Sequence, residues 1–597
     1  MSSSLSLYVV RVSDPRAVVA SLRSIAAGKY MQYYPHDTYL MALDAAHAEA
    51  VHSLRGVEGV FAMPAEAKTA SRAAQVRAAA GATATLDVQV AVTNETRGTF
   101  ASTLMSWQRD LRKVVPPSSF TMRWASTSKV VVVVDVAQED AVWAWLAEQP
   151  LVVCIEERPT FIINNKYASM AVQSNDGTQN KLWSQGLLGS GEIVGCADTG
   201  VDYDSCFFQD PNQQVKTCQG LGAPANCVNM NHRKIVSYRY FASTNVGDTS
   251  YGHGTHVVGS ILGNSLSSDY TVSYNGGAPE AKLSFDDISS DGSSLWLPDD
   301  LNTDLFPHAF AVGANLHSNS WGSSTSAYTS TAQEMDQFIF DHDDFLILVA
   351  AGNSGPGAGT IGSPATAKNI LAVGAGANTL AAYQDYDGYT GTAHDKQRTG
   401  LVDFSSRGPT PDGRFKPDIV CPGESIRSAY SDGTLTSFQC SIAEMSGTSM
   451  ATPTCAGASA LVRQYFREGF LSSGARNASA AMAPSASLVK AIMIHAGQPM
   501  WYTESSTWRL PPSLPHVSQG FGRVDLESVL YFGPSTPFKL KVHDREVVED
   551  QQTRHFCFLA PSRPSSLVFR ASLVWTDPPA PVGSQRTLMH DLNLLVQ

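Results

Sequence analysis

The first 160 residues contain two copies of one order of short apolar strands and amphipathic helices. Alternation of apolar and polar residues predicts strands, whereas apolar residues at helical spacing predict helices. The first copy is expected to have strands over 5–12, 38–43 and 57–62 and helices over 15–25 and 45–54. The second is expected to have strands over 86–92, 129–136 and 151–155 and helices over 99–111 and 138–148. The pattern predicts two small α+β units, residues 1–64 and 86–165, joined by an alanine-rich linker over 65–85.

Farther along, from about residue 187, apolar strands alternate with helices. This alternation is typical of an α/β domain with a doubly wound, mostly parallel sheet, which we place over residues 166–533. In open sheets of this kind, ligands bind outside the carboxyl ends of the strands. Strands are expected over 192–197, 281–285, 345–350 and 370–373.

The last part of the chain, residues 534–597, is rich in strand-forming residues. Residues 538–542 and 566–575 are expected to be strands of a β-sandwich or jelly roll. A two-sheet sandwich needs more strands than these residues supply, so we expect a partial domain that is truncated at residue 597.

Composition narrows the class of protein. A chain of 597 residues exceeds the size of a single core, and 43% hydrophobic with 16% charged residues is a globular composition. The net charge of −12 argues against nucleic acid or an anionic membrane as the main partner. No apolar run approaches the length of about 18 residues that a membrane helix needs.

Cysteine placement bears on the compartment. Cys206, Cys218 and Cys227 lie close together, and Cys421 and Cys440 are also near in sequence. This placement suits disulfides in an oxidising compartment, although spacing does not assign partners. A zinc site at the first three is the alternative, disfavoured because no C-x-x-C pair is present.

Two further features give opposite indications of location. Residues 1–10 lack the basic start and long apolar stretch of a signal peptide. Asn94 and Asn477 begin glycosylation sequons, which point outward. Together, the sequons and the cysteines favour an extracellular protein or one in a secretory or endolysosomal lumen.

Three segments carry candidate catalytic groups. Asp198 ends an apolar strand, His253 lies among small residues at the start of an apolar helix, and Ser449 lies in a tight turn before another helix. A serine hydroxyl is a weak nucleophile until a base takes its proton, and histidine titrates in the right range to be that base. A buried carboxylate fixes the imidazole tautomer and stabilises the imidazolium.

A fourth segment, residues 350–355, follows an apolar strand and contains Asn353. The side-chain amide of Asn353 can donate a hydrogen bond to a tetrahedral oxyanion. Loss of one such donor costs about 100- to 1000-fold in turnover.

These four segments, in this order, resemble the signature blocks of the subtilase family over about residues 166–526. The resemblance implies a subtilisin-like fold and a serine endopeptidase that forms an acyl-enzyme at Ser449. In this interpretation His253 is the general base and acid, Asp198 orients it, and Asn353 stabilises the oxyanion. No cofactor is required for catalysis, while structural calcium is common in the family. Further matching blocks are 276–282, 318–322, 404–409, 416–419 and 520–525.

The resemblance also implies where polypeptide substrates bind. Ser320, Trp321 and Gly322 match the strand that pairs with the substrate backbone, and Gly352 belongs to the block of Asn353. Gly362 matches the floor of the pocket for the residue before the scissile bond. A glycine there leaves room, so we expect cleavage after large apolar residues.

The flanking parts resemble parts of subtilases as well. Residues 573–577 and 591–594 are similar to alkaline subtilases with a C-terminal β-barrel domain. The two N-terminal units resemble prodomains, which implies a zymogen whose own N-terminal part is an intramolecular inhibitor, removed near residues 164–167. We expect the enzyme to be a monomer.

Several residues have simpler interpretations than function. Cys196 and Cys455 are expected to be small buried hydrophobes, with a regulatory thiol as the alternative. The competing view of the whole chain is a catalytically silent scaffold, which the presence of all three triad residues and Asn353 disfavours. Turn or cap roles are expected for His256, His308, His317 and His342, and a solvated acidic face rather than a calcium site for Asp341, Asp343 and Asp344.

Overall fold

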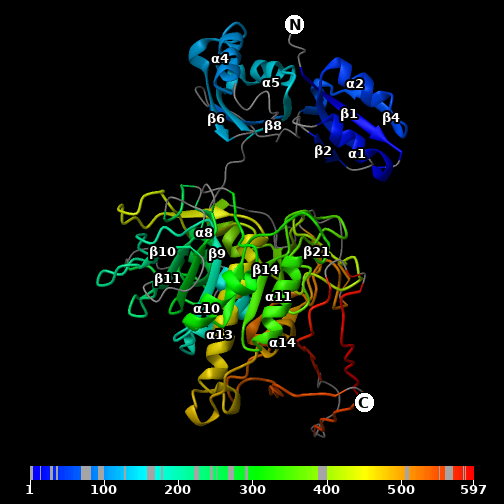
Figure 1. The fold of residues 1–597 in the computed structure, drawn as a ribbon. Coiled ribbons are helices and arrows are strands. Elements are labelled where there is room, and N and C mark those ends of the chain that lie inside the picture. Colours follow the sequence, from blue (N-terminus) through cyan, green and yellow to red (C-terminus); the bar gives the residue numbers. More distant parts are fainter. Residues whose placement is uncertain are drawn as a thin grey trace. The chain divides into compact units, whose positions relative to one another are not determined.

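The fold is described from a computed structural model of the chain (Figure 1). Its contacts divide the chain into two compact units, Met1–Thr160 and Phe161–Gln597. The structure describes residues 5–13, 15–26, 31–34, 38–68, 83–91, 100–126, 129–157, 168–175, 179–220, 227–241, 246–250, 252–266, 274–289, 294–387, 400–503, 510–511, 513–549, 551–558, 569–581, 584 and 586–596.

The first unit contains two four-stranded antiparallel sheets with the same topology. The first sheet has the order β2-β3-β1-β4 and the second the order β6-β7-β5-β8, so each copy follows a β-α-β-β-α-β path. The elements of the first copy are β1 Ser6–Val12, α1 Pro15–Ile25, β2 Met31–Tyr34, β3 Thr38–Leu43, α2 Ala45–His52 and β4 Val57–Ala62. Those of the second are β5 Thr83–Val90, α4 Phe100–Leu111, β6 Phe120–Ser126, β7 Lys129–Asp135, α5 Glu139–Ala147 and β8 Val152–Glu157.

Every strand and helix expected in this unit is present, within a few residues at the ends. The pattern missed β2 and β6, which are edge strands that pair on one side only. The expected linker begins as a 3-10 helix, Ala65–Lys68, and its last three residues belong to β5. The two copies also share a small apolar cluster, in which Leu7 and Leu40 of one lie with Val153 of the other.

The second unit is built on a sheet of mostly parallel strands in the order β10-β11-β12-β9-β13-β14-β15-β17-β22-β20; β16 also pairs with β15, and β21 pairs with β16. This confirms the predicted α/β class. The strands are β9 Ile193–Asp198, β10 Thr217–Gln219, β11 Ile235–Tyr240, β12 Lys282–Asp287, β13 Leu316–Asn319, β14 Leu346–Ala350, β15 Leu371–Gly376, β16 Gly400–Leu401, β17 Ile419–Pro422, β20 Gly497–Gln498, β21 Tyr502–Thr503 and β22 Arg523–Val524; a separate hairpin pairs β18 Ile426–Ala429 with β19 Ile442–Met445.

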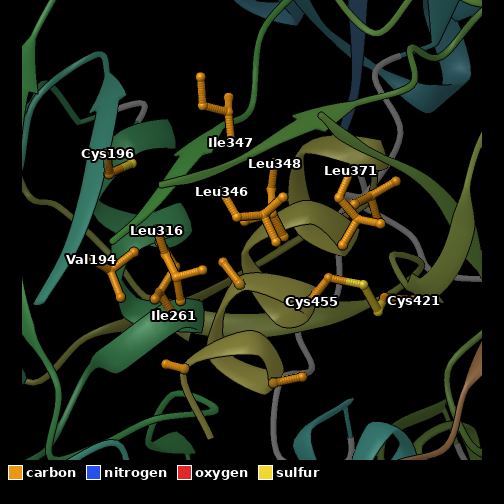
Figure 2. Close-up of a cluster of buried hydrophobic side chains, with 14 of the residues drawn as sticks. Val194, Cys196, Ile261, Leu316, Leu346, Ile347, Leu348, Leu371, Cys421 and Cys455 are labelled. Atoms are coloured by element: carbon orange, nitrogen blue, oxygen red, sulfur yellow. A yellow bond between two sulfur atoms is a disulfide. The ribbon is translucent and has the colours of Figure 1, made fainter. Parts of the chain in front are cut away.

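Helices cover both faces of this sheet. Successive strand residues point to opposite faces. On one face, Val194 lies in the core cluster with Ile261 of the helix His253–Leu262 (Figure 2). The next residue, Gly195, faces the other side, where an added Cβ would lie 3.1 Å from Ala309 of the helix Phe306–Val312. The helices are α6 Ala168–Ser174, α7 Lys181–Ser184, α8 His253–Leu262, α9 Leu301–Asp304, α10 Phe306–Val312, α11 Ser330–Asp341, α12 Leu380–Asp387, α13 Thr448–Arg467 and α14 Ala486–His495.

Disulfides resolve the cysteine predictions. Cys206 pairs with Cys440, Cys218 with Cys227 and Cys421 with Cys455. These pairs exclude a zinc site at Cys206, Cys218 and Cys227, because a sulfur atom in a disulfide is no longer a thiolate that could bind the metal. The interpretation of Cys455 as a simple hydrophobe was wrong, because β17 brings Cys421 against helix α13 in the core (Figure 2). Cys196, by contrast, is a buried free thiol, and burial raises its pKa well above the ordinary value.

The C-terminal strands were predicted wrongly for the residues that the structure describes. Residues 538–542 and 569–575 form no strand there, since neither finds a neighbouring strand to accept and donate backbone hydrogen bonds. Residues 566–568 lie outside the described part. Side-chain hydrogen bonds attach the segment instead: Asp577 accepts from the Lys368 ammonium (2.5 Å), and its carbonyl accepts from the Asn369 amide (2.8 Å).

Across the described ranges, no helix combines the length and the apolar character that crossing a membrane would require.

Candidate active site

The predicted catalytic residues all lie at the carboxyl edge of neighbouring parallel strands. Asp198 is the last residue of β9, and β13 and β14 are the next strands in the sheet. Asn353 follows β14, while His253 begins α8 and Ser449 is the second residue of α13. This is the edge at which open α/β sheets bind ligands.

Asp198 and His253 form the central pair. The imidazole Nδ1 lies 2.6 Å from Asp198 Oδ1, and the carboxylate is fully buried while 19% of the His253 side chain is exposed. Burial lowers the pKa of His253, but the charge of Asp198 and its hydrogen bond raise it more, so the pKa lies above its ordinary value. Such a pair holds Nδ1 protonated and leaves Nε2 to accept a proton.

Ser449 is tied to the end of β13. Its hydroxyl donates to the carbonyl oxygen of Ser320 (2.9 Å), and the Ser320 hydroxyl donates to the carbonyl of Ser449 (2.9 Å). The next residue, Trp321, donates its indole N–H to the carbonyl of Ala197 (3.1 Å), directly before Asp198. These bonds bring the Ser449 turn and the Asp198 strand end to one place.

Asn353 is oriented by a residue that the sequence did not single out. Its Oδ1 accepts from both the backbone N–H and the hydroxyl of Thr448, each at 2.9 Å. The Nδ2 group is thereby directed at the turn before Ser449, 3.5 Å from where a Cβ on Gly447 would lie. The Thr448 hydroxyl also accepts from the N–H of Gly352 (3.2 Å).

Gly322 and Gly362 lie where the 320–323 and 361–363 segments approach each other closely. A Cβ on Gly362 would lie 2.2 Å from the carbonyl oxygen of Ser323, and one on Gly322 would lie 3.1 Å from that of Ser363. Real Cβ atoms essentially never approach backbone oxygen as closely as 2.2 Å, so the fold requires glycine at 362. β13 ends at Asn319, so Ser320–Gly322 lie beyond the strand that precedes them.

A second buried carboxylate was also missed. Asp248 lies in the loop before His253 and accepts hydrogen bonds from Thr199 and Thr255, the neighbours of Asp198 and Gly254. No motif marks it, because its four donor groups belong to Thr249, Thr255 and the distant Thr199.

Of the four other histidines that were expected to have turn or cap roles, three differ from the prediction. His342 does cap helix α11. His256, His308 and His317 are instead buried, and burial lowers the pKa of His256 and His317 to about 3. The His256 Nε2 lies 2.8 Å from the carbonyl of Ile426 in β18.

The acidic run before β14 binds protein groups. Asp343 pairs with the guanidinium of Arg545 (2.7 Å), and Asp344 accepts from the side-chain amide of Asn315 (3.2 Å). Within the ranges that the structure describes, no three His, Cys, Asp or Glu side chains are gathered in a way that could hold a metal ion.

Comparisons with known proteins identify the family of the chain. Residues 189–522 match the model of the subtilase family. The serine protease/ABC transporter B family protein tagD of Dictyostelium discoideum is 31% identical over 568 residues, covering 77% of this chain and 30% of tagD. The serine protease AprX of Bacillus subtilis is 33% identical over 297 residues, covering 47% of this chain and 58% of AprX.

Among solved structures, the S41 psychrophilic protease is 28% identical, with 57% of this chain and 92% of that chain covered and a TM-score of 0.38. The chain spans only 28–30% of the length of three curated Dictyostelium relatives that match it over 72–77% of its own length.

Proposed function

Because the chain belongs to the subtilase family, we propose that it is a serine endopeptidase that hydrolyses polypeptides through an acyl-enzyme at Ser449. The proposal rests on the hydrogen bond between His253 Nδ1 and Asp198 Oδ1 (2.6 Å), which lies at the same edge of the sheet as Ser449. The activity of the whole protein is part of the proposal, since the chain spans less than a third of its relatives in Dictyostelium.

In the proposed reaction, the Ser449 hydroxyl turns from the Ser320 carbonyl toward His253 and attacks the scissile carbonyl. Nε2 of His253 takes the hydroxyl proton and later gives it to the leaving amine, while Asp198 stabilises the imidazolium. Asn353 Nδ2 donates to the oxyanion. Water then attacks the acyl-enzyme, with His253 again as the base. Catalytic hydrogen bonds of this kind are often unformed before substrate binds.

Substrate choice follows from the pocket residues. On the family resemblance, we propose that the backbone at Gly362 is the floor of a pocket for a large apolar side chain before the scissile bond, and that Ser320–Gly322, with Gly352 nearby, pair with the substrate backbone. A peptide library is expected to show cleavage after aromatic or leucine-like residues. A strong preference for basic residues at that position contradicts the assignment.

Regulation and location are proposed on the same family basis. The two N-terminal α+β units would inhibit the enzyme within its own chain until cleavage near residues 164–167, a stretch outside the described residues. The three disulfides support an oxidising compartment, either extracellular or lumenal. A monomer is expected. N-terminal sequencing of the active enzyme should find a start near 164–167, and an intact Met1 or Ser2 contradicts the zymogen.

The central experiment is labelling of the full chain with a fluorophosphonate probe, which reacts with an activated serine. Wild type should be labelled and Ser449→Ala should not. Ser459→Ala is the matched control, because Ser459 lies on the same helix α13 and its buried hydroxyl donates only to the helix carbonyl of Cys455. An unlabelled wild type refutes the proposal and favours a catalytically silent scaffold.

A further inference from the structure

Asp248 is a buried carboxylate, 7% exposed, that belongs to neither the triad nor the oxyanion site. Its Oδ1 accepts from the Thr199 hydroxyl (3.0 Å) and the N–H of Thr249 (3.0 Å). Its Oδ2 accepts from both the N–H (2.8 Å) and the hydroxyl (2.7 Å) of Thr255. An ionised carboxylate accepts all four of these bonds, whereas an asparagine amide loses the two bonds to one of its oxygens because an NH2 group only donates.

The partners of Asp248 are the immediate neighbours of the catalytic pair. Thr199 follows Asp198, and its hydroxyl also accepts from the N–H of Gly254 (2.9 Å), which follows His253. The backbones are in close contact here, since a Cβ on Gly254 would lie 2.2 Å from the carbonyl oxygen of Gly200. One carboxylate thus holds the end of β9 and the first turn of α8 together.

We propose that Asp248 is a positioning residue, which acts through Thr199 and Thr255 to set the hydrogen bond between Asp198 and His253. The inference rests on the proposed function, because it concerns the base of that reaction. A misplacement of about 1 Å between reacting groups can cost about 100-fold in rate. Asp248 is therefore expected to affect turnover without touching substrate.

Charge gives the proposal a second consequence. Burial lowers the pKa of His253, and the charge and hydrogen bond of Asp198 together with the charge of Asp248 raise it above its ordinary value. Burial raises the pKa of Asp248 itself to about 6, against the hydrogen bonds of Thr255. The titratable groups that face Asp248 are Asp198 of β9, His253 of α8, Tyr238 of β11 and Asp287 of β12.

The test measures the rate of fluorophosphonate labelling of the full chain against pH. For Asp248→Asn we expect the labelling rate to fall by about 10- to 100-fold. We also expect the acid limb of the pH–rate profile, where the rate drops as His253 takes up a proton, to move to lower pH, because one negative charge beside His253 is lost. Asp336→Asn is the matched control. Asp336 is fully buried and accepts from Tyr328 and the N–H groups of Lys368 and Asn369, so it should leave the limb in place.

A second pair of variants keeps the test decisive if Asp248→Asn does not fold. Thr199→Ser retains the hydroxyl that bridges Asp248 and Gly254, whereas Thr199→Val retains the shape and loses it. We expect Thr199→Ser to label within about twofold of wild type and Thr199→Val about 10-fold slower or more.

The outcomes separate this inference from the proposed function. If wild type is not labelled, the proposed function fails. If wild type is labelled, the inference is overturned by a folded Asp248→Asn protein with wild-type rate and limb, or by equal rates for Thr199→Ser and Thr199→Val. If the Asp248→Asn protein is labelled more slowly but its acid limb does not move, Asp248 has only a structural role, and the inference is also overturned.

Discussion

The disulfide between Cys421 and Cys455 should be one of the larger single contributions to the stability of the second unit. It closes a loop of 34 residues and ties β17 to α13, the helix that carries Ser449. The perturbation is the double variant Cys421→Ala/Cys455→Ala. The matched comparison is Cys218→Ala/Cys227→Ala, which opens a loop of only 9 residues.

The magnitude follows from the chain entropy that each cross-link removes from the unfolded state. For a 34-residue loop the loss is about 3.8 kcal/mol at 25 °C, and for a 9-residue loop it is about 2.6 kcal/mol. Cys421 and Cys455 are both fully buried, so lost packing adds to the first figure. Cys218 is partly exposed, and less packing is lost there.

The assay is urea unfolding followed by tryptophan fluorescence, with the shift in midpoint multiplied by a common slope. Fluorophosphonate labelling before denaturation checks that each variant is native at Ser449. A smaller loss for the 421–455 variant than for the 218–227 variant refutes the reasoning, since both loop length and burial predict the opposite order.

Four further predictions concern the catalytic pair and the core. Asp198→Asn should slow labelling about 10,000-fold with an unchanged circular dichroism spectrum, because asparagine no longer holds Nδ1 of His253 protonated; a loss below tenfold contradicts the assigned role. Wild-type labelling should be lost as pH falls through a value above about 6.5, since the raised pKa of His253 leaves the base protonated below it. The raised pKa of His253 also adds stability that is present below about pH 6.5 and is lost as pH rises through the pKa of His253 in the folded state. Urea midpoints of wild type and His253→Gln, measured at pH 6 and pH 9, would detect this loss. Leu348→Ala, in fully buried β14, should lower the free energy of unfolding by about 2–5 kcal/mol, and a change below 1 kcal/mol in urea unfolding counts against the described core.

Local patterns in the chain were sufficient for the central sheet and for the candidate triad. Strands such as β9 and β14 are continuous apolar runs because parallel strands are buried on both faces, and this signal survives in the sequence alone. Asp198, His253 and Ser449 could be selected because their residue types suit one reaction and their segments, in this order, resemble the blocks of one family. The alternating pattern likewise revealed both N-terminal copies except for the edge strands β2 and β6.

Relations between distant residues were decided only by the tertiary structure. The partner of Cys206 lies 234 positions away, and Cys455 was interpreted as a hydrophobe because nothing near it in sequence indicates β17. The strands expected after residue 533 are missing where the structure describes them, because strand formation depends on a neighbouring strand and not on composition. Asp248 was invisible for the same reason: its donors at Thr199 and Thr255 converge on one carboxylate only after β9 and α8 have packed, and a hydrogen bond acts over 3 Å of space, whatever the separation along the chain.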